Sequence, residues 1–99
     1  MEITVTGRHL EVSDGVRSHI DRGTERLLKH FEGIRKVAFT LSEEGGGTVK
    51  AEMVVHAVRG VNLAAEAVDA TAHAAVDAVV DRMDRQVRKL KERLKDRRG

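Results

Sequence analysis

The order of apolar and polar residues divides the chain into four alternating segments and two segments with a helical period. Alternation over residues 2–6 places Ile3 and Val5 on one face and two threonines on the other, as in a half-buried strand. The same alternation returns over 35–42, over about 48–58 and over 61–67. We therefore predict four strands, which form a sheet with one apolar face and one mostly polar face.

Two segments repeat their apolar residues every three to four positions, which predicts amphipathic helices. The first follows Ser13, an expected N-cap, and runs for about 18 residues towards Gly33, an expected C′ glycine. Gly23 in its interior should cost about 1 kcal/mol relative to alanine, so this helix is expected to depend on its packed face. The second helix is predicted over about 70–96, along an apolar stripe from Ala72 to Leu94.

Glycines mark the predicted turns between these segments. Gly7 follows the first strand, the stretch Glu43–Gly47 contains three consecutive glycines, and Arg59-Gly60 predicts a tight reversal. The order is β-α-β-β-β-α, an α+β fold in which both helices cover the apolar face of a four-stranded sheet. No linker or repeat divides the 99 residues, so residues 1–99 are expected to form one domain.

The composition predicts a soluble domain with an aliphatic core. Hydrophobic residues make up 40% of the chain and charged residues 34%, which is apolar enough to fold and more ionic than average. The chain has two Phe, no Tyr and no Trp, so it lacks the aromatic side chains on which single-stranded nucleic acid is usually stacked. It also lacks cysteine and any apolar stretch long enough to span a membrane. We expect a cytoplasmic protein without a membrane partner.

The net charge of +2 conceals an asymmetry along the chain. Residues 1–81 hold 9 Lys/Arg against 13 Asp/Glu, a net −4, whereas residues 82–98 hold 9 against 3, a net +6. A basic segment of this kind is typical of proteins that bind polyanions, although cations also stabilise the C-terminal end of a helix by themselves. Charge alone leaves both interpretations open.

A helical projection places the basic residues of the second helix on one face. At about 100° per residue, Arg82, Arg85, Lys89 and Arg93 lie within an arc of about 80° beside the apolar stripe. The acidic residues Asp77, Asp81 and Asp84 lie on the opposite flank. On the first helix, Arg22, Arg26 and Lys29 also point away from the apolar residues. If the helices pack side by side, two basic ridges should flank a common surface, unless these cations serve only solubility.

The segment DAVVDRMDRQVRKLK, residues 77–91, resembles the signature of the ribosome hibernation promoting factor family, also labelled ribosome-associated inhibitor, ribosomal subunit interface protein or sigma-54 modulation protein. The opening TGRHLEVS, residues 6–13, the first-helix pattern and the order of elements are similar as well. The resemblance implies a fold like the double-stranded RNA-binding domain with an added N-terminal strand. It also implies a factor that occupies the channel for messenger RNA and A- and P-site transfer RNA on the small ribosomal subunit, blocks translation and stabilises idle ribosomes.

The resemblance also carries over residue by residue. It implies contacts with ribosomal RNA by Arg82, Arg85, Gln86, Lys89 and Lys91 of the second helix and by Arg26 of the first, to which the helical projection adds Arg93, Arg22 and Lys29. Two positions depart from the family pattern: Thr71-Ala72-His73 replaces an Asp-Met-Tyr run, and Gly23 stands where the family has a lysine. Many members continue into a dimerisation domain, so a dimerising domain or a second hibernation factor is a further implied partner.

Nothing in the sequence predicts an enzyme. The five histidines show no metal-binding spacing and are expected at the surface, and Gly45-Gly46-Gly47 lacks the Lys-Ser/Thr of a phosphate loop. Asp77 and Asp81 lie one helical turn apart and are interpreted as ordinary surface charge beside Arg82 and Arg85. We therefore expect no metal, no cofactor and no small-molecule substrate. Two alternatives to the ribosome are a generic double-stranded RNA binder and an interaction domain that uses its polar sheet face or an edge strand.

Overall fold

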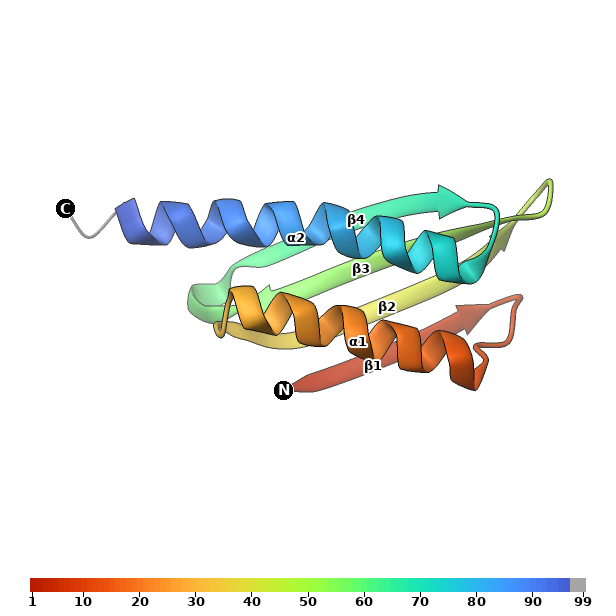
Figure 1. Ribbon diagram of the computed structural model, residues 1–99, viewed down its shortest axis with the longest axis horizontal. Helices are drawn as coiled ribbons and strands as arrows, with labels where there is room; N and C mark the ends of the chain where they lie inside the picture. The colour runs from red at the N-terminus through yellow and green to blue at the C-terminus, as the bar shows by residue number, and fades with distance from the viewer. Residues whose placement is uncertain (97–99) are drawn as a thin grey trace.

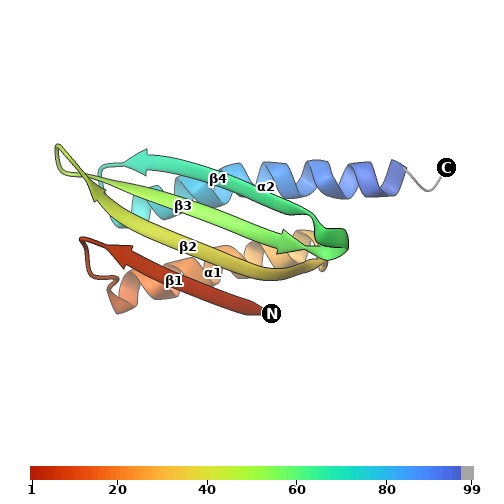
Figure 2. The same cartoon turned by 180° about the vertical axis from the view of Figure 1, so that it is seen from behind.

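Four strands and two helices follow one another in the order β-α-β-β-β-α, which confirms the predicted fold (Figures 1 and 2). The structure is a computed structural model and describes residues 1–96. The elements are β1 (Glu2–Arg8), α1 (Asp14–His30), β2 (Ile34–Glu44), β3 (Thr48–Ala57), β4 (Asn62–Asp69) and α2 (Ala72–Asp96), with a short 3-10 turn at Val58–Gly60 between β3 and β4.

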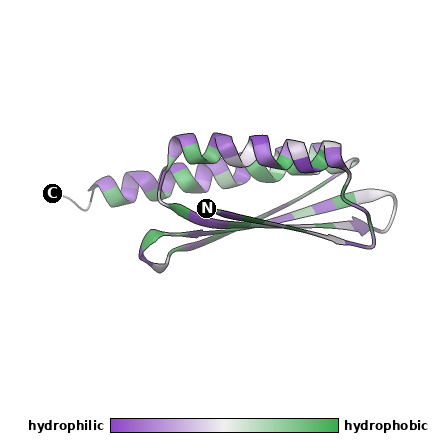
Figure 3. Cartoon of the chain, turned by 90° about the horizontal axis from the view of Figure 1, so that it is seen from below, coloured by the Kyte–Doolittle hydropathy of each residue, from purple (hydrophilic) through white to green (hydrophobic). Residues whose placement is uncertain are grey.

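The strands lie in the sheet in the order β1-β2-β3-β4, with β1 and β4 at the two edges. β1 runs parallel to β2, whereas the pairs β2–β3 and β3–β4 are antiparallel. A parallel pair needs a crossover connection, and α1 supplies it. α2 follows β4 and returns over the same face of the sheet, so the two helices form a single layer, seen from below in Figure 3.

The hydrophobic core lies between this helix layer and the sheet. The inward side chains of β2 and β3 alternate as predicted, with Val37, Phe39, Leu41, Ala51, Met53 and Val55 all at most 1% exposed. The helices contribute Ile20, Leu27, Val76, Val79, Met83 and Val87, which are equally buried. Hydrophobic and hydrophilic bands alternate along both helices in Figure 3. The amphipathic period that predicts the helices is therefore the period of their contact with the sheet.

The predicted start of α1 is confirmed, whereas its predicted end is not. The Ser13 hydroxyl accepts a hydrogen bond from the Val16 N–H, as expected of an N-cap. The predicted C′ glycine is wrong, because the helix ends earlier, at Phe31, which has an extended backbone. The ring of Phe31 folds over Gly33 and fills the space that a side chain there would occupy. Gly33 is thus required by this close contact and not by a left-handed helix end.

The turns also differ in detail from their predicted positions. Gly7 belongs to β1, and the residue with positive φ after this strand is His9 (φ 60°). β2 extends through Glu44, so the hairpin loop is shorter than predicted. The tight reversal at Arg59-Gly60 is confirmed, since both residues have positive φ, 62° and 69°. Two consecutive left-handed residues match the right-handed twist of the strands they join.

α1 and α2 are in close contact at a glycine, Gly23 of α1. A Cβ atom on Gly23 would lie 2.9 Å from Cγ2 of Val80, which is 3% exposed on the facing side of α2. Val80 is β-branched and packed in the core, so it has little freedom to move away. The glycine that lowers the intrinsic stability of α1 therefore allows the two helices to pack side by side.

We predict that Gly23→Val destabilises the protein by about 2 kcal/mol, because three added carbon atoms overpack the contact with Val80. Glu25→Val is the matched control, because the same side chain at an exposed position of α1 should change stability by less than about 0.5 kcal/mol. Urea unfolding followed by circular dichroism measures both. Equal midpoints for the two variants would show that the helices do not depend on this contact.

Candidate nucleic-acid interface

Three side-chain pairs join the helices along their length. His19 pairs with Asp77, Arg26 with Asp81 and His30 with Asp84; we call this set the interhelix ladder. Residue numbers rise together in the three pairs, so α1 and α2 run parallel. Asp77 and Asp81, which the sequence interpretation took as ordinary surface charge, pair with side chains of α1. Two of the five histidines, expected only as surface residues, have partners here.

Asp84 is the buried member of the interhelix ladder. Asp84 is only 7% exposed, although the helical projection placed it with the acidic residues of the surface. The carboxylate pairs with Nδ1 of His30 at 2.6 Å through one oxygen and with Nε of Arg88 at 3.1 Å through the other. No buried side-chain nitrogen or oxygen within residues 1–96 lacks a hydrogen-bond partner. The charge of Asp84 is therefore compensated inside the molecule, as a buried carboxylate requires.

The ladder changes the predicted shape of the basic surface. The acidic side chains of α2 line the groove towards α1, so the surface between the two predicted basic ridges carries both signs of charge. Arg26 donates a hydrogen bond to Asp81, and this bond together with the nearby carboxylate charge raises the pKa of Arg26 despite partial burial. The positive charge of Arg26, a predicted RNA contact, is thus already paired within the protein.

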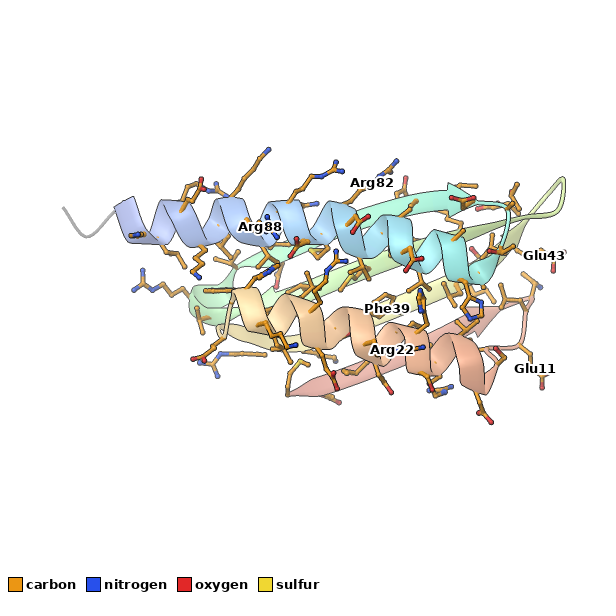
Figure 4. The ribbon with its side chains drawn as sticks, in the orientation of Figure 1. Glu11, Arg22, Phe39, Glu43, Arg82 and Arg88 are labelled. Carbon is orange, nitrogen blue, oxygen red and sulfur yellow. The ribbon has the colours of Figure 1, made fainter. Side chains whose placement is uncertain are left out.

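Two predicted RNA contacts bind the edge of the sheet. The guanidinium of Arg82 donates to the main-chain carbonyl of Glu66, and the Gln86 amide donates to the carbonyl of Ala64 at 2.7 Å. Both carbonyls belong to β4, an edge strand. Figure 4 shows Arg82 on the border of α2 next to β4. Arg82 and Gln86 therefore attach α2 to the edge of the sheet, a contact that sequence reasoning missed.

The remaining cations of this side of α2 are exposed. With Arg82 they form the outer row, which consists of Arg82, Arg85, Lys89 and Arg93, all exposed. Across the residues that the structure describes, no ion pair joins Arg85 or Lys89 to an acidic side chain. These two cations are available to an external anion without the cost of breaking an internal pair.

A second group of cations gathers where α1 ends beside α2. Lys29 of α1 and Arg88 and Lys91 of α2 line a hollow of about 270 Å³ together with His30 and Glu92. We call Lys29, Arg88 and Lys91 the helix-end patch. Arg88 was not among the predicted site residues, although its spacing of four from Asp84 is the signal that could have found it.

Arg22 lies apart from both groups. It lines a hollow of about 390 Å³ between the helices with His19, Arg26 and Asp77, and Figure 4 shows it on α1. The predicted site residues thus fall into three places: the outer row with Gln86, the helix-end patch, and the groove beside Asp77. Among the side chains of residues 1–95, no three metal-ligating groups lie close enough together to hold an ion. Neither helix has an apolar stretch that could cross a membrane.

The fold and these cation groups define a small α+β domain with a charged helix layer. A ribosomal subunit interface protein from Coxiella burnetii has the same fold, with a TM-score of 0.84 over 93% of this chain and 99% of that one, at 18% sequence identity. The family model described as sigma 54 modulation protein / S30EA ribosomal protein matches residues 3–95. The chain belongs to this family, which confirms the resemblance seen in the sequence.

Closer relatives support the same assignment. The ribosome hibernation promoting factor of Azotobacter vinelandii is 32% identical over 93 residues, which are 94% of this chain and 85% of that protein. The N-terminal domain of Thermus thermophilus Protein Y is 32% identical, with a TM-score of 0.81 over 91% of this chain and 99% of that one. The ribosome hibernation promotion factor of Bradyrhizobium diazoefficiens is 30% identical over 98% of this chain, which spans only 48% of that protein.

We predict that Asp84→Asn destabilises the protein by about 1 to 3 kcal/mol, because it removes the charge that His30 and Arg88 share. Asp77→Asn is the matched control: it also removes a histidine partner from α2, but at a side chain that is 67% exposed, where an ion pair contributes at most about 1 kcal/mol. Urea unfolding at neutral pH compares them. A larger loss in the Asp77 variant would contradict the structural role of Asp84.

Arg82 and Arg85 should differ in their effects on stability. Arg82→Ala removes the hydrogen bond to β4 and should destabilise the fold by about 0.5 to 1 kcal/mol. Arg85→Ala removes an exposed, unpaired side chain and should leave the unfolding midpoint unchanged. Thermal unfolding of the two variants tests this difference, and identical midpoints would show that the edge contact of Arg82 contributes nothing to stability.

Proposed function

We propose that this chain is a ribosome hibernation factor that binds the small ribosomal subunit through its helix layer and blocks translation. Membership of the S30EA family and the names of the relatives support a role in hibernation. The observation that supports the binding surface is the division of charges on α2. Its three N-terminal acids pair with α1, whereas Arg85 and Lys89 of the outer row have no acidic partner among residues 1–95.

The available cations suit the phosphate backbone of ribosomal RNA. Each phosphate that a lysine or arginine neutralises releases counterions, and this release supplies most of the affinity of such interfaces. The outer row and the helix-end patch lie on different sides of α2, so one helix can contact RNA strands on two sides. The chain has no Tyr or Trp to stack bases, which favours recognition of RNA by shape and phosphate position.

The proposed mechanism is steric and includes no chemical step. The domain would occupy the channel for messenger RNA and the A- and P-site transfer RNAs, where its bulk excludes both ligands. A rigid helix pair suits this role, because it fixes the backbone positions from which the cations reach the RNA and so limits the conformational entropy lost on binding. In this proposal the protein acts in the cytoplasm. A dimerising domain or a second hibernation factor, the further partners that the family resemblance implies, would in this proposal act on ribosomes that this domain has already occupied.

We predict that Arg85→Ala/Lys89→Ala weakens binding to small subunits by at least about tenfold and lowers the salt-dependence slope by about two, because two phosphate contacts are lost. The control is Lys36→Ala/Lys50→Ala, which removes the same charge from the opposite face of the sheet. Cosedimentation across a salt series measures both variants. An equal loss in the two would show that net charge, and not the helix layer, determines binding.

A linear RNA duplex added in excess distinguishes the ribosome from RNA in general. If the proposal is correct, the duplex should displace little of the bound protein from small subunits, because a simple duplex reproduces only part of the channel's phosphate arrangement. Complete displacement at comparable phosphate concentration would favour the generic double-stranded RNA binder.

A further inference from the structure

The two edge strands of the sheet, β1 and β4, differ in their contacts with the rest of the chain. Arg82 and Gln86 donate hydrogen bonds to two carbonyls of β4, so part of that edge is occupied. Within residues 1–96, no side chain forms a hydrogen bond to the main chain of β1. No strand lies beyond β1 in the sheet, although the first turns of α1 extend past the C-terminal end of β1 in the helix layer (Figures 1 and 2). The edge formed by β1 is therefore open to another strand.

β1 has few of the features that usually prevent edge-to-edge pairing, since its only charged residues, Glu2 and Arg8, stand at its two ends. Its sequence, EITVTGR, contains no proline and no lysine, and six of its seven residues are exposed. Two of the three exposed large hydrophobic residues, Met1 at 58% and Ile3 at 37%, lie in this strand or directly before it. Alternating threonine and aliphatic residues also favour strand pairing. The open edge thus has the properties of a strand that can be extended.

The sequence of β1 is complementary to itself in one arrangement. In an antiparallel pair of two β1 strands centred on Val5, Glu2 of each copy lies opposite Arg8 of the other. Thr4 lies opposite Thr6 on the same face, and such cross-strand pairs are stabilising. An in-register parallel pair would instead place Glu2 against Glu2 and Arg8 against Arg8. Shifting the antiparallel pair by two residues removes the charge pairs.

We propose that β1 is a self-association edge, at which a second copy of this chain adds its β1 in antiparallel orientation about Val5. The twofold axis of this pair is perpendicular to the sheet, so the result is an eight-stranded sheet with all four helices on one face. The outer row and the helix-end patch stay uncovered in both copies. Seven residues per copy form a smaller interface than the roughly 1,200 Å² of a standard complex, so the dimer is weak and depends on concentration.

Sedimentation equilibrium of the full chain, from micromolar to millimolar concentration, tests the charge pairing. We expect a monomer–dimer equilibrium that Arg8→Glu weakens several-fold, because each Glu2 then faces an acidic side chain. The double variant Glu2→Arg/Arg8→Glu restores the opposite charges and should recover dimerisation. A dimer that Arg8→Glu does not affect, or that the double variant does not recover, would overturn the proposal.

The absence of cysteine from the chain allows a direct test of the axis. Val5 is the one position of β1 that faces its own copy, at a Cα separation of about 4.5 to 5.5 Å, within the range of a disulfide. Val5→Cys should therefore form a disulfide-linked dimer on mild oxidation, whereas Val68→Cys, exposed on β4, should do so much less. Equal crosslinking of the two variants, or a wild-type chain that stays monomeric at millimolar concentration, would overturn self-pairing and leave the edge to a strand of another protein.

Discussion

The contact between Gly23 and Val80 determines how closely α1 and α2 approach, and the arrangement of charge follows from that approach. A side chain at position 23 would separate the helices, because Val80 is held by the core. At the observed separation, the short aspartates of α2 reach the longer side chains of α1. One glycine with a poor helix propensity thus allows three polar pairs to form, and the loss of intrinsic helix stability is offset by packing between helices and by these pairs.

These pairs place the acidic and the basic side chains of α2 on different sides of the helix. The acidic side chains in the first half of α2 pair with side chains of α1. On the β4 side of α2, one cation binds the edge of the sheet and the others are exposed to solvent. A chain whose net charge is only +2 can in this way present unpaired cations locally, because most of its acids lie elsewhere or already have partners. For binding to a polyanion, the local field near the contact matters more than the net charge.

The sequence predicts the elements well and the neighbours of each helix face poorly. Alternation and the 3.6-residue period depend on contact with a single apolar layer, so the strands, the helices and the buried positions are found from the pattern alone. A helical projection gives the angle of a residue but not what lies beside it. It therefore placed Asp84 at the surface, whereas Asp84 is buried against His30. The family resemblance offered Arg82 and Gln86 only as RNA contacts, whereas both bind β4. The spacing of Asp84 and Arg88 was the one local sign of this network.

The interhelix ladder also fixes the position of one helix along the axis of the other. A slip of α2 by one turn in one direction would place Arg85 against Arg26 and Arg88 against His30, which are pairs of bases. A slip in the opposite direction would place Val80 against His30 and leave the buried Asp84 with only Arg88, from its own helix, as a partner. Packing of aliphatic side chains alone would tolerate such a slip more easily. The polar pairs therefore select one axial alignment, and with it one distance between Lys29 at the end of α1 and the cations of α2.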